Sequence, residues 1–132
     1  MPEPVAFLSH PAFRAAAAAF VPELAVASPE TWRLLIATVD VAVADRAARL
    51  RRQLGGFLRL LDLAARVRFA KPLHRLDLDI RIAFLRSFER APVALLRRGV
   101  WGLRTLVFLG YYTQPTVIAS LGYRASAAGW SR

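Results

Sequence analysis

The stretch Thr105-Leu-Val-Phe-Leu-Gly-Tyr-Tyr-Thr-Gln-Pro-Thr-Val-Ile-Ala-Ser-Leu-Gly-Tyr123 contains no charged residue, although the chain around it is rich in arginine. Glycine adopts left-handed backbone angles without strain, so Gly110 and Gly122 are expected to end helices. Pro115 suits the first turn of a new helix. The stretch therefore predicts a helix end, an aromatic corner at Tyr111-Tyr112, a short helix, and a second aromatic corner.

Helical patterns also fill the chain before this stretch. Ser28-Pro29-Glu30 is a strong start signal, because it combines a capping serine, a proline in the first turn, and an acid near the positive end of the dipole. Apolar residues then recur at spacings of three and four, which predicts a helix over residues 29–54 that ends at Gly55-Gly56. Ser9 is expected to cap an earlier helix. Comparable signals predict further helices over residues 12–20, 57–69 and 92–109.

Residues 76–82 alternate between apolar and charged side chains, which by itself is typical of a strand. We nevertheless expect a helix, because the segment has no partner strand and continues into residues 83–88 with helical spacing. The chain is thus predicted to be all-α, a compact irregular bundle of five or six helices. Residues 1–123 should form a single helical domain, followed by a C-terminal tail over residues 124–132.

The charge of the chain is strongly basic and unevenly distributed. Residues 1–45 hold two basic and five acidic residues, whereas residues 46–132 hold 17 basic and four acidic residues, which gives a net charge of +10. Lys71 is the only lysine, so the basic character comes from arginine. A basic surface attracts nucleic acid, anionic lipid or an acidic partner protein, and the composition does not choose among them.

The last third of the chain resembles a known family. The pattern Gly110-Tyr-Tyr, two residues, Pro115, and a short apolar helix to Gly122-Tyr123 is similar to the C-terminal signature of subunit 3 (the gamma or small subunit) of gluconate 2-dehydrogenase-type complexes. Residues 15–23 and 84–106 resemble earlier segments of that family more weakly. The resemblance implies that this chain partners a large flavoprotein of the glucose-methanol-choline oxidoreductase type, which holds FAD and oxidises a sugar or another alcohol.

In such a hetero-oligomer this chain would be a non-catalytic small subunit that stabilises or matures its partner, and it would hold no cofactor itself. Exposed aromatic side chains would anchor the interface. The expected anchors are Trp101, Tyr111, Tyr112, Pro115, Tyr123 and Trp130. The start of the chain shows no secretory or twin-arginine leader, which departs from many members of the family. A cytoplasmic location is therefore expected, or a periplasmic one if the chain is exported with its partner.

Catalytic and metal-binding signatures are missing from the sequence. Ser9 and His10 are adjacent, which rarely permits a hydrogen-bonded dyad, and Gly55-Gly56 lacks the lysine and spacing of a phosphate loop. Asp77 and Asp79 diverge on a helix and have too few neighbouring ligands for a metal. We therefore expect no catalytic residue and no metal site in this chain.

Two other functions stay open. The chain is alternatively a basic helical protein that binds nucleic acid, although it has no asparagine and no recognised nucleic-acid-binding motif, so this class is not favoured. It is alternatively a peripheral membrane protein held by arginines and interfacial aromatic residues. A membrane-spanning helix is not expected, because Gly110 to Pro115 interrupt the uncharged run.

Overall fold

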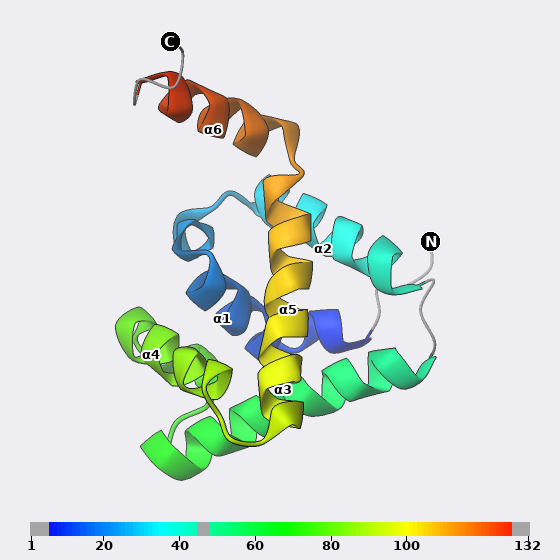
Figure 1. Cartoon of the computed structure of the whole chain (residues 1–132), viewed down its shortest axis with the longest axis vertical. Coiled ribbons are helices and arrows are strands. Elements are labelled where there is room, and N and C mark those ends of the chain that lie inside the picture. The colour runs from blue at the N-terminus through cyan, green and yellow to red at the C-terminus, as the bar shows by residue number, and fades with distance from the viewer. Residues whose placement is uncertain (1–5, 45–47, 128–132) are drawn as a thin grey trace.

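The computed structural model describes residues 6–44 and 48–127, and these residues form helices without any strand. The elements in chain order are η1 Ala6–Ser9, α1 Pro11–Phe20, η2 Pro22–Val26, α2 Pro29–Ala44, α3 Ala48–Phe69, η3 Leu73–Arg75, α4 Leu78–Glu89, α5 Ala94–Tyr112 and α6 Pro115–Ala127. Figure 1 shows α5 running through the middle of the molecule, α3 crossing its base, and α6 extending from the opposite end. The predicted all-α bundle of five or six helices is confirmed.

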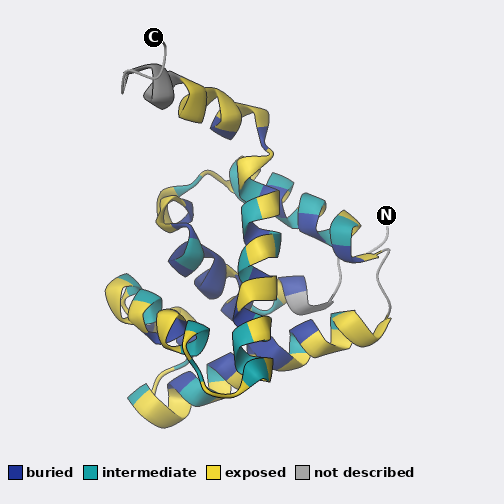
Figure 2. Cartoon of the chain, viewed as in Figure 1, coloured by how far each residue is buried: buried dark blue, intermediate teal, exposed yellow. Residues whose placement is uncertain are grey.

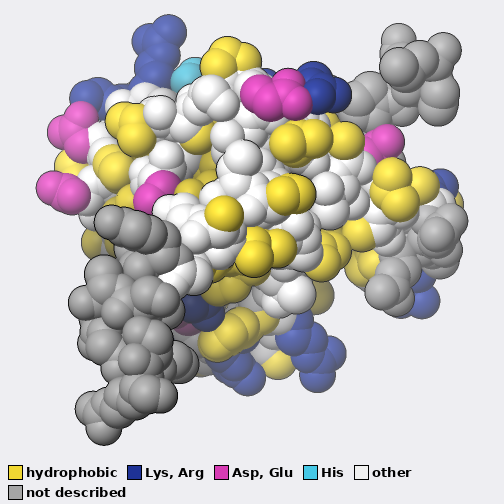
Figure 3. Space-filling model, turned by 90° about the horizontal axis from the view of Figure 1, so that it is seen from above, with side chains coloured by type: hydrophobic (Ala, Val, Ile, Leu, Met, Phe, Trp, Pro, Cys, Tyr) yellow, Lys and Arg dark blue, Asp and Glu magenta, His cyan; other side chains and the backbone are white. Residues whose placement is uncertain are grey.

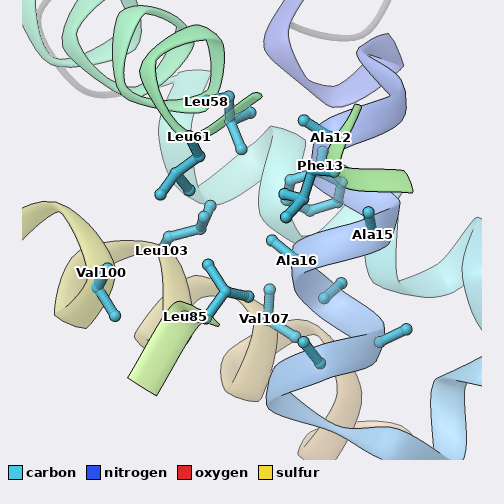
Figure 4. Packing of buried hydrophobic residues seen from close by; sticks show 14 of the residues in the cluster. Ala12, Phe13, Ala15, Ala16, Leu58, Leu61, Leu85, Val100, Leu103 and Val107 are labelled. Atoms are coloured by element: carbon cyan, nitrogen blue, oxygen red, sulfur yellow. The ribbon is translucent and has the colours of Figure 1, made fainter. Parts of the chain in front are cut away.

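Helix α1 lies at the centre of the core, and six of its ten residues are alanine. It packs against α3, α4 and α5 as well as the flanking 3-10 turns. The small side chains allow these helices to approach closely, and Phe13 supplies the one large fully buried side chain of α1. Figure 4 shows Leu58 and Leu61 of α3, Leu85 of α4, and Val100, Leu103 and Val107 of α5 in the hydrophobic cluster to which α1 also contributes.

Helices α2 and α5 pack very closely at Gly110. A Cβ atom on Gly110 would lie 2.9 Å from the backbone oxygen of Leu35, 2.9 Å from its Cγ atom, and 3.1 Å from Cγ2 of Val39. The prediction that Gly110 ends a helix was wrong, because α5 continues through it to Tyr112. The glycine is needed for the close approach of two helices and not for a left-handed turn.

The boundary between the second and third predicted helices was also wrong. Helix α2 ends at Ala44, and α3 runs without a break from Ala48 through Gly55-Gly56 to Phe69. The glycines stay helical because Leu54 precedes them and Phe57 follows them on one continuous buried face. Packing of such a face outweighs the low helix propensity of glycine, which amounts to about 1 kcal/mol per residue.

Most of the expected helix starts are confirmed, with one change of cap. The Ser28 hydroxyl accepts a hydrogen bond from the backbone N–H of Thr31 at 3.2 Å, as expected for a capped helix. The cap of α1 is His10 and not Ser9, since His10 Nδ1 accepts the N–H of Ala12 at 3.0 Å. Of residues 76–82, which were predicted to be helical against their alternating pattern, residues 78–82 are helical, whereas Leu76 and Asp77 precede the helix; Pro115 begins α6.

Helix α6 leaves the body of the bundle after the corner at residues 113–114 (Figure 1). It runs through Gly122 to Ala127, so the predicted stop at Gly122 was wrong and helix continues past the predicted domain end at residue 123. Figure 2 shows that α6 is exposed along most of its described length. Its contact with the bundle is made near its start, where Val117 is buried.

Candidate interaction surface

The most distinctive surface feature is a row of aromatic side chains along α5. Trp101, Arg104, Phe108 and Tyr112 recur at spacings of three and four, so they lie on one side of the helix. The Arg104 guanidinium lies 5.0 Å from the Trp101 ring centroid and 4.8 Å from that of Phe108. Phe108 and Tyr112 meet edge to face at 5.4 Å. We call these four residues the α5 aromatic row.

Arg104 is held by aromatic rings and not by a carboxylate. Within residues 6–44 and 48–127, no acidic group lies at ion-pair distance from Arg104. A guanidinium over an aromatic face gains about 0.5–1 kcal/mol at an exposed site and keeps its hydrogen-bond donors available. The row therefore presents a positive charge that is held in position between two apolar rings.

The row is exposed at both ends. Trp101 is 51% exposed and Tyr112 is 37% exposed, and the neighbouring Leu109 is 41% exposed. These are large apolar side chains, which usually gain free energy when they are removed from water. Three such side chains on one described helix indicate a contact surface.

An apolar groove lies directly beside the row. It has a volume of about 410 Å³ and is lined from α2, α3 and α5. No charged side chain is among its lining residues, which are Ala42, Val43, Leu50, Leu54, Trp101, Gly102, Thr105, Leu106 and Leu109. Trp101 thus belongs to both the groove and the aromatic row, which makes it the central residue of the candidate surface.

The corner between α5 and α6 is fixed by a buried glutamine. Gln114 is only 3% exposed, and its Nε2 atom donates at 3.0 Å to the carbonyl of Gly110 and at 3.0 Å to that of Thr31. Its Oε1 atom is buried and has no hydrogen-bond partner within the described part of the chain. These bonds tie the start of α6 to α2 as well as α5, so the direction in which α6 projects is set by the bundle.

Helix α6 carries an apolar stripe that begins on the core and continues beyond it. Val117 is 8% exposed, whereas Ile118 and Leu121 are 55% and 39% exposed. Their spacing places them on one side of the helix next to Gln114. Figure 3, which looks onto the end of the molecule from which α6 extends, shows hydrophobic side chains across the centre of this face and charged side chains of both signs at its margins.

The predicted interface residues have different positions in this arrangement. Trp101 and Tyr112 lie on the aromatic row, and Pro115 is exposed at the first position of α6. Tyr111 contacts the Tyr112 ring at 4.9 Å but is partly buried against the core. The side chain of Tyr123 and the whole of Trp130 lie outside the residues that the structure describes.

Sequence reasoning missed the residues that join the predicted anchors. Arg104 and Phe108 link Trp101 to Tyr112, and Ile118 and Leu121 are further exposed apolar side chains on α6. The three- and four-residue spacing from 101 to 112 was a usable signal. It was obscured because the helix was expected to end at Gly110.

The polar side chains inside the bundle have structural roles. Asp62 accepts hydrogen bonds from the Leu73 N–H and from Arg66 Nε, each at 3.0 Å. Burial acts to raise the pKa of Asp62, but these two donors outweigh it and the pKa lies below its usual value. Arg81 donates to the carbonyls of Ala15 and Leu76, and burial lowers its pKa. In the described residues, no group of three or more metal-ligating side chains converges.

Comparisons of the chain with protein-family models, with curated proteins and with solved structures find no match. The family resemblance of the last third therefore stays a prediction from the sequence. Across residues 6–44 and 48–127, no helix combines the length and the apolar character required to cross a bilayer.

Proposed function

We propose that this chain is a non-catalytic small subunit of an FAD-dependent alcohol or sugar oxidoreductase complex, in which it stabilises or matures the flavoprotein catalytic subunit. The observation that supports a subunit role is the exposed apolar surface formed by the α5 aromatic row, the adjacent groove and the outer part of α6. Exposed aromatic residues with an ordered arginine between them are typical of the residues that dominate binding energy at interfaces.

The surface suits a partner that inserts apolar side chains beside Trp101. The groove accepts such side chains, while Arg104, which stacks on the Trp101 ring outside the groove, is available to an acidic group on the partner. The net charge of +10 would also accelerate association with an acidic protein. An exposed apolar surface of this kind is more typical of a subunit of a permanent complex than of a transient partner.

The identity of the partner rests on the resemblance of the sequence. The pattern from Gly110 to Tyr123 is similar to the small subunits that accompany glucose-methanol-choline type flavoproteins. The complex is therefore proposed to be a hetero-oligomer whose FAD and catalytic groups belong to the large subunit. This chain is proposed to bind no cofactor.

The deciding experiment is an affinity purification of the tagged chain from its native cells, followed by an absorbance spectrum of the eluate. A co-purifying protein several times larger, with flavin absorption bands, is the expected result. A chain that elutes alone, or with nucleic acid and without flavin, would overturn the proposal.

The surface itself is tested by the double substitution Trp101→Ala/Tyr112→Ala. Loss of two anchors should weaken the complex by more than about 2 kcal/mol, which is about thirtyfold in affinity. Val26→Ala is the matched control, because Val26 is 90% exposed and lies in η2, outside the candidate surface. Circular dichroism checks that the helical content of both variants is unchanged. Equal affinity of the double variant and the control would remove the α5 aromatic row from the interface.

A further inference from the structure

The outward face of α3 combines arginines with exposed apolar side chains. Helix α3 lies along the base of the molecule, and Figure 2 shows its outer side exposed to solvent. Leu60, Leu63 and Val67 are 42%, 58% and 80% exposed. None of them belongs to the candidate interaction surface, so this face requires a separate explanation.

Helical geometry arranges these residues in an ordered way. At about 100° per residue, Leu60, Leu63 and Val67 lie within about 60° of one another, opposite the buried face formed by Leu54, Phe57, Leu58, Leu61 and Ala65. Arg59 and Arg66 lie along one edge of this apolar strip, whereas Arg68 lies about 80° beyond the other edge, and its guanidinium lies 5.3 Å from the Phe69 ring centroid. The exposed face therefore has an apolar strip with arginines along one border.

The N-terminal half of the same face adds further positive charge. Arg49 and Arg52 are both exposed there, so basic residues extend for about 26 Å from Arg49 to Arg66. The one acidic residue of α3 is Asp62, which is turned toward η3 and paired with Arg66. Among the described residues, Arg49, Arg52 and Arg59 form no ion pair.

We infer that the outer face of α3 is a docking surface for an anionic lipid membrane. Its apolar strip would enter the boundary between headgroups and acyl chains, while the bordering arginines reach lipid phosphates with their extended side chains. The charge favours an anionic surface, and the apolar centre favours lipid over nucleic acid, because a phosphate backbone gives Leu63 and Val67 nothing apolar to contact. This inference does not depend on the flavoprotein proposal.

The test is co-sedimentation of the full chain with vesicles of two compositions. Vesicles of equal parts phosphatidylglycerol and phosphatidylcholine should bind the chain, and vesicles of phosphatidylcholine alone should not. Arg52→Gln/Arg59→Gln should lower binding about thirtyfold, since each basic residue near an anionic surface contributes about fivefold. Leu63→Gln/Val67→Gln should lower binding at least about tenfold, because the apolar contact is lost.

Matched variants control for charge and for hydrophobicity. Arg90→Gln/Arg98→Gln removes the same net charge from the residue after α4 and from α5, and Val26→Gln/Leu95→Gln removes exposed apolar side chains from elsewhere. Both should retain binding within about threefold, and all substituted side chains are exposed, so thermal unfolding should be little changed.

Two results would overturn the inference. An equal loss of binding in Arg52→Gln/Arg59→Gln and in its control Arg90→Gln/Arg98→Gln would show that net charge alone, and not the α3 face, drives binding. Loss with the arginine variant but not with the Leu63/Val67 variant, together with competition by duplex DNA, would assign the face to nucleic acid.

Discussion

Replacing Gly110 with alanine should destabilise the protein, although alanine is the better helix former. Alanine normally gains about 0.5–1 kcal/mol over glycine within a helix. At this position the new Cβ atom would lie 2.9 Å from a backbone oxygen of α2, which is at least about 0.5 Å closer than an ordinary contact. A backbone atom cannot rotate away as a side chain can, so α2 and α5 must separate.

The magnitude follows from two opposing effects. Overpacking of a well-packed core costs about 1–3 kcal/mol, and the upper part of that range applies because backbone and two side chains are involved. Subtracting the helix-propensity gain leaves a net loss of about 1–2 kcal/mol in the free energy of unfolding. The same substitution at Gly102, also in α5, meets no atom within 4 Å and should stabilise the protein by about 0.5–1 kcal/mol.

Urea unfolding followed by circular dichroism measures both variants against the parent protein. Their free energies of unfolding should differ by about 2–3 kcal/mol, which corresponds to about 10 °C in Tm for a chain of this size. Because the two substitutions lie in the same helix, opposite signs of their effects on stability separate the packing at Gly110 from the helix propensity of alanine. A Gly110→Ala variant as stable as the parent, or more stable, would refute the close approach of α2 and α5 as the reason for this glycine.

Three further variants test other contacts in the bundle. Asp62→Asn should lower the free energy of unfolding by about 1–2 kcal/mol in neutral buffer, because the charged bond to Arg66 is lost. The folded-state pKa of Asp62 is lowered, so its contribution is present above the usual carboxyl pKa near 4 and disappears as pH falls through the folded-state value. The free energies of unfolding of Asp62→Asn and of the parent protein should therefore become equal in acid. A difference between them that does not change with pH would contradict this role of Asp62. Gln114→Ala should increase hydrogen exchange of the α6 amides selectively, and unchanged protection would show that the glutamine does not hold the corner. Gly56→Ala should stabilise α3 by about 0.5–1 kcal/mol in urea unfolding, because the position is helical and open, whereas destabilisation would contradict an uninterrupted helix.

The helix starts were predictable because their signals are local. Ser28, Pro29 and Pro115 act through their own backbone geometry and through atoms only a few residues away. The helical character of residues 78–82 was predictable from context. The helix ends were less predictable, because Gly55-Gly56 and Gly110 stay helical through contacts with distant residues that no short window of sequence contains.

The sequence allowed us to predict which kinds of residue form the candidate surface, but not how these residues are arranged. Trp101 and Tyr112 were expected at an interface, and the structure places both at the exposed ends of one row. Tyr111 has the same chemistry but turns partly toward the core, since adjacent residues on a helix point about 100° apart. The role of Arg104 was not predictable from the sequence. It depends on the positions of the Trp101 and Phe108 rings, which are set by rotamers and packing.

The alanine-rich helix α1 also has a consequence for how the protein is made. Its burial depends on α4 and α5, whose residues lie about 60–100 positions later in the chain. At a synthesis rate of about 5–20 residues per second, α5 follows α1 from the ribosome after roughly 4–20 s. An isolated helix of ten residues is marginal in water, so α1 cannot be completed by local contacts alone. We therefore expect α1 to become ordered only after α4 and α5 have been made, and nascent chains that stop before α4 to remain without a stable core.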